Sequence, residues 1–115
     1  MKAMYTKNKL QIITDTVARE ARARFGDKLD AVILYGSYAR GDYDDESDID
    51  IMVRVICEKD RLSEYRHILS DVASELSLEN NIVVSVSVVD TETFSRYRRH
   101  LPYFENVDRE GIKIA

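Results

Sequence analysis

The sequence has little of what marks secreted, membrane or nucleic-acid-binding proteins. It contains one cysteine, Cys57, which excludes an internal disulfide and fits a reducing compartment. No apolar run approaches the length of a membrane span, and the N-terminus lacks the apolar core of a signal peptide. Acidic residues outnumber basic ones, 21 to 17, which disfavours a surface built to grip nucleic-acid phosphates. We therefore expect a cytoplasmic protein for which membranes and nucleic acids are not the main partners.

Length and composition bound the organisation of the chain. With 115 residues, 44% of them hydrophobic, the chain can bury one modest core. No internal repeat, linker or low-complexity segment divides it. We therefore expect a single domain over residues 1–115.

Hydrophobic periodicity predicts two long helices and three strands. Apolar residues recur at helical spacing over residues 7–25 and 60–79. Short apolar runs over residues 29–35 and 48–55, and a β-branched run over residues 82–89, predict strands. This alternation predicts an α/β (α+β) fold in which a small mixed sheet packs against the two long helices in two layers.

The tail beyond residue 90 is predicted to form two short helices, because the single proline, Pro102, interrupts it. Residues 112–114 are expected to add a terminal strand or an extended arm. Basic and aromatic residues gather in this tail. They favour a packed helix with a solvated basic edge over contact with a base, an RNA end or a partner.

A glycine–serine step ends the first predicted strand. Gly36 and Ser37 are small, so backbone N–H groups can approach a ligand closely. We expect residues 37–41 to form a helical turn whose N–H groups attract phosphate oxygens, with Arg40 adding a positive charge. Taken alone, the step favours a plain strand-to-helix turn with a serine cap, and only together with Asp48 and Asp50 does it favour phosphate binding.

Two aspartates follow after an acidic loop. Asp48 and Asp50 flank Ile49, and strand side chains alternate between faces, so the two carboxylates point the same way. Like charges on one face repel each other unless a cation lies between them. Mg²⁺ takes oxygen ligands from carboxylates and substrate phosphates. The pattern predicts a phosphate site at Gly36 and Ser37 that faces a metal-binding carboxylate pair.

Together these residues resemble the signature of the nucleotidyltransferase superfamily of DNA polymerase β. After Gly36 and Ser37 come ten residues and then Asp48-x-Asp50. The motif Gly-Ser-Tyr-Ala-Arg-Gly and the small size of the chain resemble those of the minimal nucleotidyltransferase (MNT, MntA-like) branch.

The resemblance implies a fold, an activity and a set of site residues. It implies a polymerase-β-like fold and Mg²⁺-dependent transfer of a nucleoside monophosphate, AMP from ATP, to a partner protein. It also implies that Gly36, Ser37 and Arg40 bind the nucleotide, and that Asp48 and Asp50 bind the metal and take part in catalysis. Many MNT proteins are antitoxins paired with a HEPN-domain toxin, so a HEPN-type partner and a homo- or hetero-oligomer are expected.

The third predicted strand departs from the family pattern. Active members of the superfamily usually carry a third carboxylate there, and in this chain the equivalent position falls at Ser85 or Ser87. Asp90 follows, but on the opposite face by parity. Three outcomes stay open: an active enzyme with borrowed ligands, a slow enzyme, or a nucleotide-binding or toxin-binding module without catalysis.

Overall fold

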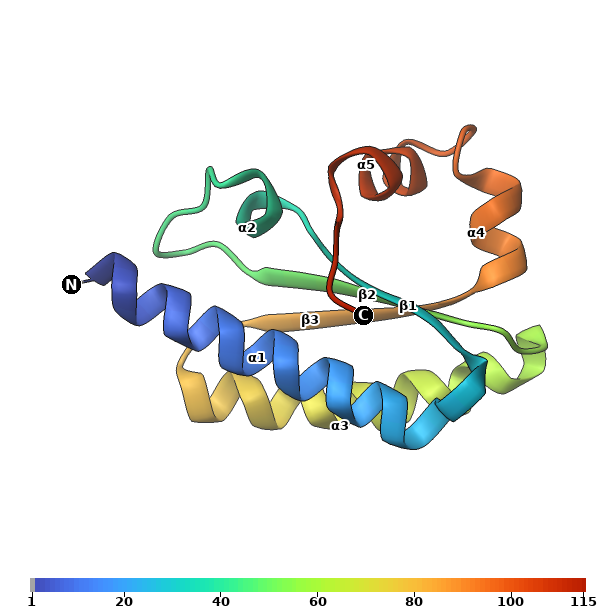
Figure 1. Cartoon of the computed structure of the whole chain (residues 1–115), viewed down its shortest axis with the longest axis horizontal. Coiled ribbons are helices and arrows are strands. Elements are labelled where there is room, and N and C mark those ends of the chain that lie inside the picture. The colour runs from blue at the N-terminus through green and yellow to red at the C-terminus, as the bar shows by residue number, and fades with distance from the viewer. Residues whose placement is uncertain (1) are drawn as a thin grey trace.

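The computed structural model describes residues 2–115, and the side chains of residues 7–115. One sheet is surrounded by helices on both sides (Figure 1). In chain order the elements are α1 (Lys2–Phe25), β1 (Leu29–Tyr35), α2 (Ser37–Arg40), β2 (Ile49–Val55), α3 (Leu62–Asn80), β3 (Val84–Asp90), α4 (Thr91–Tyr97), α5 (Pro102–Glu110) and β4 (Ile112–Lys113).

The sheet is mixed, as predicted, with the strand order β3-β2-β1-β4. Strand β1 is antiparallel to both β2 and β4, whereas β2 and β3 are parallel. Parallel neighbours need a long crossover connection, and α3 supplies it. The predicted terminal strand at residues 112–114 is confirmed by the pairing of Ile112 with Leu34 and of Lys113 with Ile33.

One face of the sheet carries the larger core. Helices α1 and α3 lie side by side against it (Figure 1), and their apolar stripes meet the inward residues of the central strands. Ile49, Ile51 and Val53 of β2 are fully buried on this face, as the alternation of side chains along a strand predicts. From α1 and α3 the fully buried contributors include Ile13, Val17 and Leu69.

The opposite face is covered by α4 and α5, so the two-layer expectation is incomplete (Figure 1). Phe94 of α4 and Val107 of α5 bury themselves against Ala31 and Met52. The guanidinium of Arg54 lies 4.5 Å from the centroid of the Phe94 ring, which is a cation–π contact. The aromatic part of the tail therefore packs against the sheet, as favoured from the sequence.

The predicted boundaries are close to those observed: α3, for example, runs from Leu62 to Asn80 rather than over 60–79. Helix α1 begins at Lys2 rather than at residue 7. Strand β3 runs from Val84 to Asp90 rather than over 82–89, and its last residue starts α4: the Asp90 carboxylate accepts a hydrogen bond of 2.9 Å from the Thr93 N–H. Among the helices described, none is long and apolar enough to span a bilayer.

Candidate functional site

The glycine–serine step forms a tight turn between β1 and α2. Gly36 has φ +77°, a conformation that favours glycine, and its carbonyl accepts the N–H groups of Ala39 and Arg40, both at 3.1 Å. These bonds close the short turn of α2. The N–H groups of Ser37 and Tyr38, which precede them, are those that helix geometry leaves without an intrahelical acceptor. The predicted helical turn at residues 37–41 is confirmed, ending at the left-handed Gly41.

Gly36 also lies against Asp50, which gives a second reason for a glycine at this position. A Cβ atom built on Gly36 would lie 2.6 Å from Oδ2 of Asp50, closer than real Cβ contacts allow. The β1–β2 register explains this approach, because Tyr35 pairs with Asp50 at the end of the antiparallel ladder. The predicted phosphate turn and the predicted metal carboxylate are therefore in direct contact.

Asp48 and Asp50 interact through their charges at the start of β2. Burial raises the pKa of Asp50, the charge of Asp48 raises it further, and Arg40 opposes both effects. Asp48 is exposed just before the strand, and Asp50 is partly buried within it. The two carboxylates therefore lie at one end of the strand, and cation binding by them stays a prediction.

On β3, the residue paired with Asp50 is Ser85, and Met52 pairs with Ser87. A serine hydroxyl therefore lies in register beside the Asp50 position, where the resemblance led us to look for a third carboxylate. Asp90 pairs with Val55, at the other end of β2, and caps α4. Within the described residues, no group of three or more acidic, histidine or cysteine side chains is arranged to hold a metal.

Arg40 is held by two carboxylates rather than pointing freely into the site. Its Nε lies 3.1 Å from Oδ2 of Asp42, and its Nη1 lies 3.2 Å from Oε2 of Glu110 in α5. These two hydrogen-bonded partners raise the pKa of Arg40, so it stays charged. An arriving phosphate would compete with Asp42 and Glu110 for the guanidinium.

The acidic loop between the two halves of the motif is ordered by its own contacts. The rings of Tyr38 and Tyr43 stack with centroids 4.2 Å apart. The N–H of Asp44 donates to Oγ of Ser47 at 2.9 Å, which fixes the loop through a serine, as expected from the sequence. The loop that leads into Asp48 is therefore ordered by hydrogen bonds and ring stacking of its own residues.

A row of hydroxyl groups next to Asp50 was missed in the sequence. The Tyr35 hydroxyl lies 3.0 Å from that of Tyr103 in α5 and 3.5 Å from Oγ of Ser87. Burial raises the pKa of Tyr35 well above its ordinary value, so the hydroxyl stays protonated. Tyr35 is the last residue of an apolar run, and the run alone predicts only a strand residue there. Tyr35 pairs with Asp50 across the β1–β2 ladder. A prediction of the strand register would therefore have placed the Tyr35 hydroxyl near the site.

A turn that presents backbone N–H groups beside paired carboxylates is the arrangement of a protein that handles nucleotide phosphates. The model of the nucleotidyltransferase domain family matches residues 15–110. The chain therefore belongs to this family, and the predicted nucleotidyltransferase resemblance is confirmed.

Curated relatives agree with the family. The "Putative protein adenylyltransferase MJ0141" of Methanocaldococcus jannaschii is 51% identical over 90 residues, which cover 76% of this chain and 81% of the relative. A second protein of the same organism and description, MJ0604, is 31% identical over 90 residues, or 78% of this chain and 82% of the relative.

Solved structures share the fold at low sequence identity. A "putative nucleotidyltransferase from Sulfolobus solfataricus" superposes with a TM-score of 0.61 at 20% identity, over 95% of this chain and 84% of that one. A toxin–antitoxin crystal structure with AMP-PNP gives a TM-score of 0.54 at 20% identity, over 89% of this chain and 72% of that one. The predicted mixed-sheet nucleotidyltransferase fold is confirmed.

Proposed function

We propose that this protein transfers AMP from ATP to a hydroxyl group of a partner protein. The observation that carries the proposal is the contact between Gly36 and the Asp50 carboxylate, because it brings a phosphate-binding turn and a metal-binding acid together. The names of the curated relatives, protein adenylyltransferases, support AMP as the transferred group and a protein as the acceptor.

In this proposal the nucleotide binds through the turn. The N–H groups at the start of α2, at Gly36 and Ser37, donate hydrogen bonds to the β- and γ-phosphate oxygens. Arg40 adds positive charge after a phosphate displaces Asp42 or Glu110 from it. The glycine allows the triphosphate to lie against the backbone without a side chain between them.

The carboxylate pair fits a hard divalent cation. Asp48 and Asp50 offer only oxygen donors, and the charge of Asp48 raises the pKa of Asp50, so a cation between them is favoured. They would hold one Mg²⁺ together with phosphate oxygens and water. When bound, Mg²⁺ would neutralise phosphate charge and favour ionisation of the acceptor hydroxyl. A cytoplasmic setting, where ATP and Mg²⁺ are plentiful, fits this chemistry.

We further propose that the acceptor is a HEPN-type toxin and that the protein is its antitoxin. Two observations support this pairing. The fold is similar to that of a toxin–antitoxin structure with AMP-PNP, and the sequence motif resembles that of MNT proteins.

The test is transfer of label from α-labelled ATP, in the presence of Mg²⁺, to the protein encoded by the neighbouring gene. Label on that protein, lost in Asp48→Ala and retained in Asp71→Ala, supports the proposal. Asp71 is an exposed acid on α3, away from the turn, so it controls for the loss of one negative charge. Absence of label with every nucleotide tested would overturn it.

A second candidate function is favoured by one observation, the serine in register with Asp50. Ser85 offers a neutral oxygen, so the site carries less negative charge than one with three acids. The protein would then bind nucleotide or toxin without catalysis. A tight complex with the partner, formed equally by wild type and Asp48→Ala and free of label, identifies this alternative.

A further inference from the structure

The two edges of the sheet are protected very differently. One edge is β4, which has two residues and carries Lys113, and short charged edges resist pairing with other strands. The other edge is β3, a seven-residue strand. Residues 81–89 contain no charged side chain, no proline and no glycine. An exposed edge strand of this length, uncharged over these residues and rich in β-branched residues, can pair with a further strand through its unpaired backbone groups.

The backbone of β3 shows which groups face outward. The Ile49 N–H donates to the Val83 carbonyl at 2.9 Å, and in a parallel ladder alternate residues bond to the neighbouring strand. The odd-numbered residues of β3 therefore bond to β2. The N–H and C=O groups of Val84, Val86 and Val88 point away from the sheet.

Both ends of this outward row are satisfied within the chain. The Val84 N–H donates to Oγ of Ser77 at 2.9 Å, and the Val88 carbonyl accepts from Nε of Arg66 at 3.3 Å. Four groups remain between these caps: the Val84 carbonyl, the N–H and carbonyl of Val86, and the Val88 N–H.

The four groups of one copy can form hydrogen bonds with the same four groups of a second copy that is related to it by a two-fold axis. If two copies of β3 pair antiparallel with Val86 opposite Val86, each Val86 N–H meets the other Val86 carbonyl. In the same register each Val88 N–H meets the Val84 carbonyl of the other copy. The same register places the Val84 N–H opposite the Val88 carbonyl of the other copy, and these two groups are already bonded within each chain, to Ser77 and Arg66.

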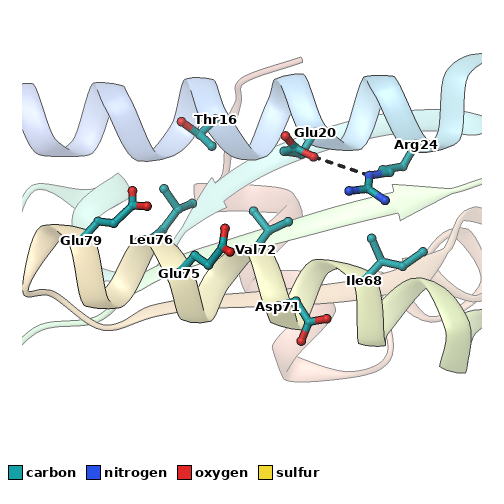
Figure 2. A pocket seen from close by; sticks show the side chains of 9 residues that line it. All are labelled: Thr16, Glu20, Arg24, Ile68, Asp71, Val72, Glu75, Leu76 and Glu79. Carbon is teal, nitrogen blue, oxygen red and sulfur yellow. Dashed lines mark ion pairs between the residues drawn. The ribbon is translucent and has the colours of Figure 1, made fainter.

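The neighbouring surface of α3 suits a second copy of this acidic chain. Figure 2 shows Asp71, Glu75 and Glu79 along the groove that α3 forms with α1. The flank of α3 beside β3 carries no acid: a groove there is lined by small or apolar residues, Ser70, Ala73, Ser74, Ser77 and Leu78, together with Val84, Ser85 and Val86 of the edge strand.

Two copies paired through β3 would bring their α3 helices next to each other. Small side chains on the facing flanks allow helices to pack at an interaxial distance of about 8–10 Å. Leu78, 86% exposed, and Val83, 57% exposed, lie at one end of this surface and would lose water contact. There they border a second groove that also contains Asp45, Glu46 and Asp48. The lining of the groove itself is uncharged, so two copies of a chain with a net charge of −4 can approach each other there without like charges meeting.

We propose that this protein forms a two-fold dimer through antiparallel pairing of β3, which joins the two sheets into one of eight strands, twice the four of each chain. The bonds that hold it are those of Val86 to Val86 and of Val88 to Val84. Isologous pairing closes after two copies, so the dimer does not extend into a filament.

Sedimentation velocity over a range of protein concentrations tests the dimer. The wild type should dimerise, and Ser74→Glu should weaken dimerisation by about tenfold or more, because two carboxylates meet at the axis. Val86→Pro should weaken it too, since it removes an outward N–H and spares the bonds to β2. Ala23→Glu adds the same charge at an exposed site on α1 and should dimerise like the wild type.

Hydrogen exchange on the same samples locates the contact. The Val86 and Val88 amides should exchange more slowly in the dimer, whereas the Val84 amide, bonded to Ser77 in each chain, should change little. Thermal melts confirm that each variant is folded. A wild type that stays monomeric at all concentrations overturns the proposal. So does a dimer that persists in both edge variants, or protection of β3 that appears only when a different protein is added.

Discussion

The two faces of the sheet differ in how completely helices cover them. Beneath α1 and α3, Ile49, Ile51 and Val53 are fully buried in the larger core. On the other face, α4 and α5 cover Met52, but the end of the sheet near Asp50 stays open and polar. The same strand β2 contributes to both faces through alternate residues. One face therefore contains the larger part of the buried apolar core, and the other leaves polar groups exposed near Asp50.

The largest expected effect comes from comparing neighbours on β2 that point to opposite faces. Ile51→Ala and Met52→Ala each remove a fully buried side chain, and such changes cost about 2–5 kcal/mol in the free energy of unfolding. Ile51→Ala should be the more costly, because it lies in the larger cluster and Met52 in the smaller. Chemical denaturation measures both. An equal or reversed order would break the comparison between the faces.

A glycine pair sharpens the comparison within the open face. Gly36→Ala and Gly41→Ala both place an alanine at positive φ, which costs about 1–2 kcal/mol of stability. Only at Gly36 does the new Cβ meet Asp50, whereas nothing lies within 4 Å of a Cβ at Gly41. Gly36→Ala should therefore also lose ATP binding, measured by calorimetry. Equal ATP affinities in the two variants would show that the Asp50 contact is unimportant.

Measuring protein stability as a function of pH distinguishes the contribution of Asp50 in the site from that of the apolar core. The pKa of Asp50 is raised from 3.8 by burial and by Asp48. Folding therefore favours the protonated form of Asp50 over the charged form. The protonated carboxyl contributes its full stabilisation to the folded state below the pKa that Asp50 has in the unfolded chain, and this contribution is lost as the pH rises through the pKa of Asp50 in the folded protein.

Asp50→Asn removes this charge. The variant should melt at a higher temperature than wild type near neutral pH, and the difference should vanish below about pH 4, where Asp50 is protonated in both states. Asp71→Asn is the control for an exposed acid. A destabilised Asp50→Asn at neutral pH would mean that the carboxylate supports the fold rather than the site.

The smallest expected effect concerns the ion pair between α2 and α5. Glu110→Gln should release Arg40 for a phosphate and tighten ATP binding modestly, with little change in stability because the pair is exposed. Glu105→Gln, whose partner is Arg109 on the same helix, should leave ATP affinity unchanged. Weaker ATP binding in Glu110→Gln would show that the ion pair orients Arg40 productively.

Local patterns predicted much of the fold and the local part of the site. Periodicity placed the two long helices and three strands, and the spacing of Gly36, Asp48 and Asp50 placed the turn beside the strand start. These features depend on residues close in sequence. The Arg40–Glu110 ion pair and the Tyr35–Tyr103 hydroxyl pair join residues 70 and 68 apart, and no local pattern reports such contacts. Covering of the second face by α4 and α5 was missed for the same reason.

The most direct test of the central claim is the Mg²⁺ dependence of AMP-PNP binding in wild type, Asp48→Asn and Asp50→Asn. If the turn and the two aspartates clamp a triphosphate through a shared cation, Mg²⁺ should tighten binding to the wild type strongly and have little effect on either variant. Binding that is equally tight with and without Mg²⁺, and equal in all three proteins, would contradict the proposed site.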